Sequence, residues 1–190
     1  MKLTRLCPHA ITRRCAPPSP RALGRFSPYR RGGGGRYNSS GFEHVFVGER
    51  RRDRGSDKMG VTGMHNWIAL YREEKARKLD YFGWFRRKGR RGPTEEPSDP
   101  AKRHVLTLQF EWGGAVKECS TSFLGSSPGF ELALFTLFFL CGEEKNDVMV
   151  GPYPLCINCF RMGGGRRAAK VGTAFPKSIS KYRVRGVSVS

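Results

Sequence analysis

The sequence predicts an α+β fold with antiparallel sheets and packed helices, and three features support this class. Residues 105–123 alternate apolar and polar side chains, and Gly113-Gly114 divides them into the two strands of a hairpin. The apolar stretch that follows has the length of a helix. Three short strand-like segments come after it, at 148–151, 154–160 and 168–175. Strands that are joined by tight turns and grouped around a helix favour antiparallel pairing over parallel crossovers.

Two helices are expected. Residues 66–78 place three apolar side chains on one face at helical spacing, which is typical of an amphipathic helix. The second helix follows Ser127 and Pro128, which suit the N-cap and the first helical position. It is apolar nearly all round until Gly142, so we expect it to be sandwiched in the core.

The segments before the hairpin are less regular. FEHVFVGE at 42–49 is short and apolar, and we expect it to be a strand. An Arg-rich stretch at 50–59 and a basic, Pro-rich stretch at 86–104 lack periodicity, so both are expected to be loops.

The charge of the chain indicates a polyanionic partner. Lys and Arg number 35 against 16 Asp and Glu in 190 residues, which gives a formal charge of +19. Nucleic acid is the first choice, because spread positive charge releases counterions from phosphates. An anionic membrane surface is the rival partner, and charge that only maintains solubility is a third interpretation. The longest apolar run, 132–141, is too short to cross a bilayer, so we expect no transmembrane segment.

We expect three parts along the chain. Residues 1–40 carry nine basic side chains, no acidic one and five prolines, which predicts a disordered basic arm. Residues 41–178 form the folded domain, and 179–190 form a C-terminal tail. The arm lacks the apolar run of a secretory signal, and a transit peptide, a nucleic-acid-binding tail and a non-native start all stay open. The compartment is therefore left between cytoplasm and secretion.

The six cysteines are scattered and do not suggest a disulfide framework. Cys156 and Cys159 have the spacing of a metal-binding pair, but a zinc site needs two further ligands at suitable spacing, and none follows. Two thiols in an apolar strand are more often small buried side chains, which is the interpretation we favour.

Two histidines and a lysine carry the strongest chemical signal. His44 lies beside Glu43 and five residues before Glu49, His65 lies at the start of the first helix, and Lys117 lies in the second hairpin strand. One neutral imidazole can take the proton of an RNA 2'-hydroxyl, and an imidazolium can protonate the departing 5'-oxygen. A lysine can offset the charge that grows on the phosphorane. From residue types alone, ordinary core or surface histidines are the alternative.

Seven collinear segments resemble one known family. They are SGFEHVFVGE (40–49), GMHNWIALYREEK (63–75), LDYFGW (79–84), LTLQFEWGGAVKECSTSF (106–123), SPGFELALFTLFFL (127–140), GPYPLCINCF (151–160) and VGTAFP (171–176). These strings are similar to segments of the EndoU family of uridylate-preferring endoribonucleases. The resemblance implies an EndoU-like catalytic lobe that cleaves single-stranded RNA at uridylates and leaves 2',3'-cyclic phosphate and 5'-hydroxyl ends.

The resemblance also implies roles for particular residues. His44 and His65 would be the acid-base pair, and Lys117 would be the third catalytic residue. Glu43 and Glu49 would be supporting carboxylates, tied to activity and to the manganese dependence of the family.

The substrate and cofactor follow from the same resemblance. Thr173 and Phe175, with a hydroxyl from Thr121 or Ser122, would hold the uracil base by hydrogen bonding and stacking. The resemblance implies Mn²⁺ dependence, but the sequence presents no obvious cluster of metal ligands, so the metal-binding residues stay unassigned. We expect a monomer.

The chain also departs from the family pattern. The resemblance covers only the C-terminal of two lobes, and the basic arm stands where a helical lobe is expected. The alternative function is therefore a catalytically impaired RNA-binding protein derived from the family by loss of that lobe. His44 and His65 are 21 residues apart, which is more than the resemblance leads us to expect and leaves room for a shift in their relative geometry.

Overall fold

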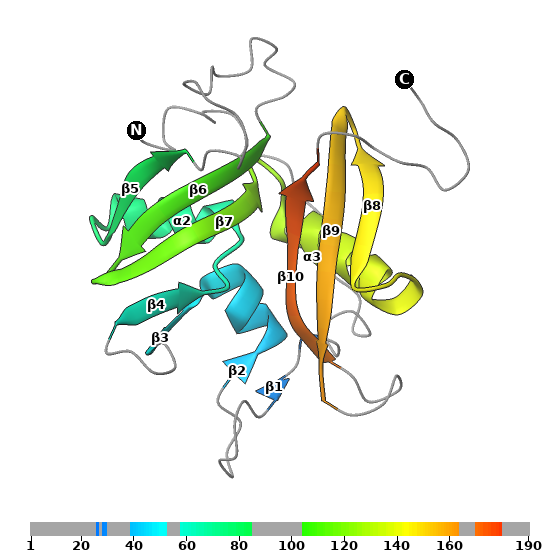
Figure 1. Cartoon of the computed structure of the whole chain (residues 1–190), viewed down its shortest axis with the longest axis horizontal. Coiled ribbons are helices and arrows are strands. Elements are labelled where there is room, and N and C mark those ends of the chain that lie inside the picture. The colour runs from blue at the N-terminus through cyan, green and yellow to red at the C-terminus, as the bar shows by residue number, and fades with distance from the viewer. Residues whose placement is uncertain are drawn as a thin grey trace.

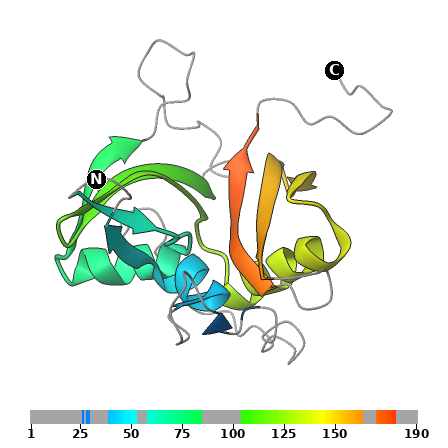
Figure 2. The same cartoon turned by 60° about the horizontal axis from the view of Figure 1, so that its bottom comes forward.

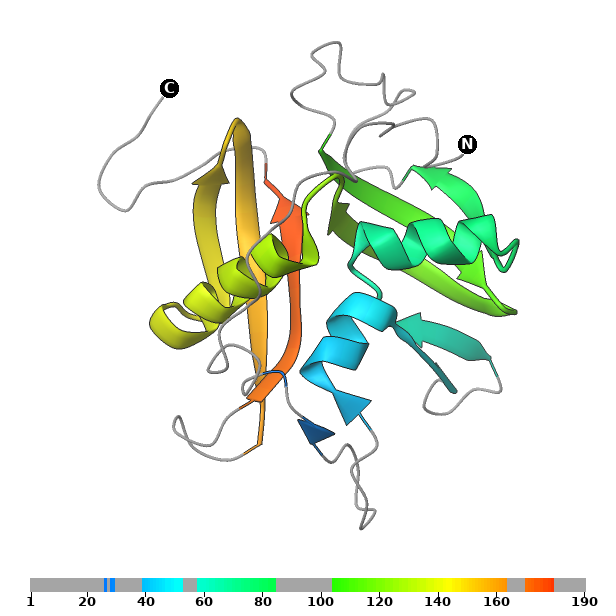
Figure 3. The ribbon, with the colours of Figure 1, turned by 180° about the vertical axis from the view of Figure 1, so that it is seen from behind.

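The structure is a computed structural model that describes residues 26, 28–29, 39–52, 58–84, 104–163 and 170–179. Two main sheets lie side by side, and each carries one long helix on the same side of the molecule (Figures 1 and 3). Strand β7 (Ala115–Phe123) of the larger sheet lies next to β10 (Lys170–Ser178) of the smaller sheet. The predicted α+β class with antiparallel sheets is confirmed.

The larger sheet has five strands. In spatial order they are β3 (Glu49–Arg52), β4 (Met59–Thr62), β7, β6 (Val105–Trp112) and β5 (Leu79–Trp84). One pair departs from the antiparallel pattern, because β4 runs parallel to β7 with a single pairing of Gly60 and Val116. Helix α2 (Trp67–Lys75) buries Trp67 and Leu70 in the core cluster of this sheet, as the amphipathic pattern predicted.

The predicted hairpin is formed by β6 and β7. Its turn residues Gly113 and Gly114 have φ angles of 55° and 79°, the left-handed values that a tight hairpin turn requires. Further along the ladder, the register slips by one residue between Lys117 and Ser120. This bulge on β7 sets the direction in which Lys117 leaves the strand.

The smaller sheet has the order β10–β9–β8, with β8 at Lys145–Val150 and β9 at Tyr153–Met162. Helix α3 (Pro128–Cys141) precedes it and begins as predicted, since Ser127 Oγ accepts a hydrogen bond of 3.0 Å from the Phe130 N–H. The three strands predicted after this helix are confirmed, and the turn between β8 and β9 contains Gly151, with a positive φ of 58°.

The expectation that α3 is sandwiched in the core is wrong. The helix covers one face of the smaller sheet, and no other helix or strand of the described residues lies on its far side (Figure 3). Leu132, Phe135 and Phe139 are buried in the core cluster, whereas the exposed side presents Phe130, Leu137 and Leu140. An all-round apolar pattern therefore does not distinguish a central helix from one that covers a single sheet.

The segment expected as a strand at 42–49 is helical. Glu43–Val47 form a short π-helical turn, η3, which ends where the Gly48 N–H donates to Glu43 O at 2.8 Å. Val45 and Phe46 are buried in the same core cluster as α3. A short apolar run can be buried by one helical turn as well as by a strand, so a segment of this length is ambiguous.

The ordered fold begins before residue 41. Phe26 is only 2% exposed and packs on Phe46 with ring centroids 6.0 Å apart. Strand β1 (Pro28–Tyr29) pairs with β2 (Ser39–Ser40), which leads directly into η3. These contacts connect Phe26 and β1 to the folded part of the chain, and the rest of the predicted arm lies outside the described residues.

The loop predicted at 50–59 is wrong at both ends, because β3 and β4 form an antiparallel ladder there. Strand β5 was not anticipated as an element. The predicted loop at 86–104 and the tail at 179–190 lie outside the described residues except for His104 and Ile179. Within the described ranges, no helix is long and apolar enough to traverse a bilayer.

Candidate active site

The candidate residues gather where the two sheets meet, around η3. Figure 2 shows η3 between the sheets, below the gap that separates β7 from β10. His44 belongs to η3, His65 directly precedes α2, Lys117 lies on β7, and Phe175 lies on β10. Residues far apart in the sequence are therefore brought to one region.

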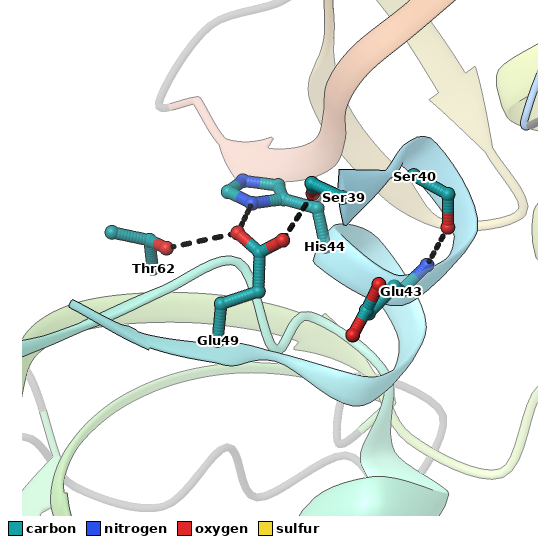
Figure 4. A network of polar contacts seen from close by, with 6 residues as sticks. All are labelled: Ser39, Ser40, Glu43, His44, Glu49 and Thr62. Carbon is teal, nitrogen blue, oxygen red and sulfur yellow. Dashed lines mark hydrogen bonds and ion pairs between the residues drawn. The ribbon is translucent and has the colours of Figure 1, made fainter. Parts of the chain in front are cut away.

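His44 is held by the carboxylate of Glu49 (Figure 4). The Nδ1 atom of His44 lies 2.9 Å from Glu49 Oε2, and the His44 side chain is buried. Ser39 donates its hydroxyl to the other carboxylate oxygen, and Thr62 lies 3.4 Å from the first. A carboxylate at Nδ1 fixes the ring orientation and places the proton on Nδ1, so Nε2 is the nitrogen that can exchange a proton with a substrate.

The local sequence explains why His44 occupies this position. Ser40 Oγ accepts a hydrogen bond of 3.0 Å from the Glu43 N–H and so caps the helical turn. Gly48, with φ of 90°, ends the turn and directs the chain into β3, whose first residue is Glu49. The five residues from His44 to Glu49 therefore reverse the chain and bring the carboxylate back to the ring.

The two histidine segments are joined through their backbones. The Met64 N–H donates to His44 O at 2.9 Å, and the His65 N–H donates to Val45 O at 2.8 Å. Gly63 makes this approach possible, because a Cβ at this position would collide with His44 O. The chain between the two histidines contains the β3–β4 ladder. The 21-residue separation in sequence therefore does not keep the two segments apart in space.

His65 is held from the opposite side by β7. Its Nδ1 lies 3.3 Å from Thr121 O and 3.2 Å from Ser120 Oγ. Since Ser120 donates its own hydroxyl to Met64 O, both neighbours of Nδ1 act as acceptors. This network assigns the proton to Nδ1 and leaves the lone pair on Nε2.

The electrostatic surroundings of His65 favour the neutral ring. Burial lowers the pKa of His65 well below its ordinary value, and the charges of Lys117 and His44 lower it further. Burial also lowers the pKa of Lys117 to about 8. His65 is therefore a neutral imidazole at pH 7, beside a lysine that is still mostly protonated.

Two of the residues expected to bind the base, Phe175 and Thr121, contact His65. Phe175 stacks on the His65 ring with centroids 4.7 Å apart and an interplanar angle of 18°, so one face of Phe175 is taken by the imidazole. Thr121 Oγ1 pairs with Thr107 Oγ1 at 3.0 Å. Ser122 Oγ and Thr173 Oγ1 are buried without a hydrogen-bond partner among the described residues. Buried hydroxyls of this kind are suited to a ligand.

Glu43 does not join Glu49 at His44. Its side chain is exposed, and only its backbone N–H takes part in the network of Figure 4. Within the part of the chain that the structure describes, no three His, Cys, Asp or Glu side chains group as metal ligands. The donor set here therefore does not fit a Mn²⁺ site, since Glu49 is already used by His44 and two hydroxyls.

Several site residues have no signal in the sequence. Ser39, Thr62 and Ser120 support the two histidines from three different strands. Glu131 is fully buried at the start of α3 and accepts hydrogen bonds from Ser126 Oγ at 2.5 Å and from Asn66 Nδ2 at 3.2 Å. In the sequence, the one indication of this contact is an acidic residue in the first turn of an apolar helix.

Cys156 and Cys159 are buried in β9, in agreement with the favoured interpretation. Burial raises the pKa of Cys159 to about 12, so this thiol stays protonated. Its Sγ donates to Phe135 O at 3.7 Å.

The architecture defines an α+β protein whose polar and ionisable residues converge at the junction of two sheets. The chain belongs to the Endoribonuclease XendoU family, whose model matches residues 25–176. The resemblance drawn from the seven segments is thereby confirmed.

Named relatives agree with this assignment. The chain is 40% identical over 158 residues to the poly(U)-specific endoribonuclease-A of Xenopus laevis, an alignment that covers 82% of this chain and 49% of the relative. It is also 40% identical to the uridylate-specific endoribonuclease C of Danio rerio, with 82% and 46% coverage. The solved structure of XendoU, described as a splicing-independent snoRNA-processing endoribonuclease, matches with a TM-score of 0.60 and 39% identity, covering 82% of this chain and 52% of that one. The chain thus spans about half the length of these relatives, in their C-terminal part.

Proposed function

We propose that this chain cleaves single-stranded RNA on the 3' side of uridylates and leaves 2',3'-cyclic phosphate and 5'-hydroxyl ends. The observation that carries the proposal is the pairing of two histidines in opposite electrostatic settings, together with a lysine, in a member of this family. His65 is buried beside cations, whereas His44 is bonded to a carboxylate.

His65 is suited to be the general base. With its proton on Nδ1 and its ring neutral, Nε2 can take the proton of the 2'-hydroxyl as that oxygen attacks the adjacent phosphorus. The new bond from the 2'-oxygen to phosphorus closes the cyclic phosphate. Phe175 holds the ring plane and excludes water from one of its faces.

His44 is suited to be the general acid. The Glu49 carboxylate at 2.9 Å can balance the positive charge of a doubly protonated ring. The Nε2 proton then passes to the 5'-oxygen as the bond from phosphorus to that oxygen breaks. One proton is therefore taken and one is given, and the reaction consumes no water.

Lys117 is suited to stabilise the phosphorane. Its pKa of about 8 leaves it mostly protonated at pH 7, and its half-buried position strengthens its interaction with an anion. The unpartnered hydroxyls of Ser122 and Thr173 would bind the edge of the uracil. Thr121 would then act through its carbonyl on His65, and Phe175 would contact the base with the ring face that His65 leaves uncovered.

Manganese is given no step in this mechanism, because the described residues do not offer a ligand set for it. The family resemblance makes Mn²⁺ an addition to be tested in the assay. The carboxylates Glu43 and Glu49 are assigned to the protein scaffold and to His44, respectively.

The test is incubation of the full chain with a short RNA that contains one uridine, in Mn²⁺ and in EDTA. We expect cleavage after that uridine, no cleavage when it is replaced by 2'-deoxyuridine, and a loss of roughly 10²- to 10⁴-fold in His44→Ala and in His65→Ala. His104→Ala is the matched control, since His104 directly precedes β6 and its ring contacts Leu124 O rather than any of the three proposed catalytic residues.

Two results would count against the proposal. Cleavage that survives both histidine variants would show that these residues are not the acid-base pair. RNA binding without cleavage by the unmodified chain would favour the RNA-binding alternative and would mean that this half of the family architecture is insufficient for catalysis.

A further inference from the structure

One face of the smaller sheet presents an ordered row of side chains beside the candidate active site. Cross-strand partners in an antiparallel ladder point to the same face. Three successive pairs of the β9–β10 ladder share the face that is turned away from α3, namely Phe160–Thr173, Asn158–Phe175 and Cys156–Lys177. The alternate positions, such as Ile157 and Ala174, are buried in the core with α3.

The middle pair of this row contacts His65, and the last pair lies close to β7. Phe175 of the middle pair stacks on His65. In the last pair, Lys177 lies near Cys119 of β7. Burial raises the pKa of the Cys119 thiol, and the positive charges of Lys117 and Lys177 both oppose that rise. The two lysines therefore flank one point at the junction of the sheets.

The first pair extends the row to the other side of His65. Phe160 is partly exposed, and its ring lies 6.4 Å from that of Phe175 at an angle of 34°. Phe160 lies opposite Thr173, whose buried hydroxyl is proposed to bind the uracil edge, so the Phe160 ring borders the uracil site on β9. A partly exposed aromatic ring next to a base site is a suitable surface for stacking of the neighbouring nucleobase.

We infer that this row is a binding track for the nucleotides that flank the cleaved uridylate, with Phe160 stacking on a neighbouring base and Lys177 binding a flanking phosphate. The inference rests on the proposed function and adds to it a subsite on each side of the cleavage point. Thr173 and Lys177 are four residues apart along β10, which corresponds to about 13 Å. A ligand that contacts both ends is therefore an extended strand and not a single nucleotide.

The charges on the same face limit where the strand runs. Lys145 and Asp147 of β8 also lie on this face, opposite Asn158 and Cys156. Their opposite charges cancel, and Asp147 disfavours phosphate at the β8 edge. The track therefore follows β10 and β9, next to the catalytic residues.

The stacking subsite is tested with a thermodynamic cycle between protein and RNA. The full chain and Phe160→Leu are titrated with a short RNA made uncleavable by 2'-deoxyuridine at the cleavage site, and with the same RNA carrying an abasic residue on the 5' or the 3' side. We expect Phe160→Leu to weaken binding of the intact RNA by roughly 5- to 150-fold and to have little effect on one of the abasic RNAs. Equal effects on all three RNAs would overturn the stacking assignment.

The phosphate subsite is tested by salt dependence. Lys177→Met should reduce the slope of log affinity against log salt by about 0.7, the contribution of one contact to a single strand. Lys75→Met is the matched control, because it removes the same charge from α2, on the helical side of the molecule. An equal change in both variants would overturn the assignment of Lys177.

These experiments separate the track from the proposed function. If the unmodified chain neither binds nor cleaves RNA, the proposed function fails. If it cleaves a uridine dinucleotide and a longer RNA equally well, and Phe160→Leu changes neither rate, the cleavage reaction stands and the track is rejected.

Discussion

The two histidines are equally buried, at 6% exposure each, yet their surroundings are opposite. His44 faces the Glu49 carboxylate within a network of hydroxyls. His65 faces a backbone carbonyl, an aromatic ring and the charges of Lys117 and His44. Burial alone therefore does not decide which ring carries a proton, since the partners of each ring determine its role.

The comparison also shows how each side is supported. The His44 side is local, because its carboxylate is five residues away and its helical turn is capped by Ser40. The His65 side depends on contacts to Ser120 and Glu131, 55 and more residues away, through His65 itself and its neighbour Asn66. Substitutions on the His44 side should therefore disturb local contacts, whereas substitutions on the His65 side should disturb contacts between distant segments.

The largest effect is expected from Glu49→Gln. The amide places an N–H₂ group where the carboxylate accepts from His44 and Ser39, so either the ring tautomer or the hydroxyl contact is lost. We expect cleavage to fall by roughly 10²- to 10⁴-fold with RNA affinity unchanged, as measured in single-turnover assays. Thr62→Val, which removes only the 3.4 Å contact, is the control. A similar loss in both variants would contradict the special role of the carboxylate.

The next effect is expected from Lys117→Met. Loss of the cation should reduce cleavage by roughly 10²- to 10³-fold. It should also raise the pKa of His65, because one of the two charges that lower it is gone. A base must be deprotonated to act, so the acidic limb of the pH–rate profile should move to higher pH. Lys117→Arg keeps the positive charge, so the acidic limb of its pH–rate profile should stay in place. If that limb does not move in Lys117→Met, the charge of Lys117 does not influence the pKa of His65.

Gly63→Ala should break the contact between the two sides. A Cβ at Gly63, with φ of 68°, would meet His44 O, so we expect a loss of about 3 kcal/mol in the free energy of unfolding and a large loss of cleavage. Gly151→Ala is the matched control, with φ of 58° and nothing within 4 Å of the added atom. It should cost about 1 kcal/mol in urea unfolding. Equal losses of unfolding free energy in the two variants would mean that backbone strain, and not the contact with His44 O, explains the need for glycine at position 63.

The smallest effect concerns stability and pH at Glu131. Burial raises the pKa of Glu131 to about 7, while Ser126 and Asn66 partly oppose the shift. Because the folded state binds this proton more tightly than the unfolded state, the stabilisation is full at low pH and is lost as pH rises from about 4.5 to 7. Burial moves the pKa of His65 the other way, so protonation of that ring opposes folding as pH falls.

Between pH 5 and pH 8, the unmodified protein should lose unfolding free energy on the order of 2 kcal/mol through Glu131, and Glu131→Gln should remove this loss. Urea unfolding of both proteins at the two pH values measures it. An identical pH dependence in the variant would show that Glu131 does not titrate in this range.

The parts of the fold that were predictable have strong local signals. The Gly113-Gly114 turn and the Ser127 cap depend on residues within a few positions of each other, and both are found as predicted. The strand expected at 42–49 was wrong because its apolar spacing fits a short strand and a helical turn equally. The exposed side of α3 could not be foreseen, since composition does not show how many layers surround a helix.

The site was predictable only in part. The residue types and the family resemblance singled out His44, His65 and Lys117, and the structure brings them to one region. The supporting contacts of Ser120 and Glu131 connect segments on different strands and helices, so no local pattern marks them. The stacking of Phe175 on His65 likewise arises only from the approach of β10 to β7.

The position of Phe175 on β10 has a consequence for synthesis of the protein. Translation releases the chain from its N-terminus, so the segments that carry His44 and His65 leave the ribosome long before β10. The ring that holds His65 in place is among the last parts of the fold to emerge. The site is thus completed only after β10 has emerged, and a nascent chain that carries both histidines without β10 lacks the ring that stacks on His65.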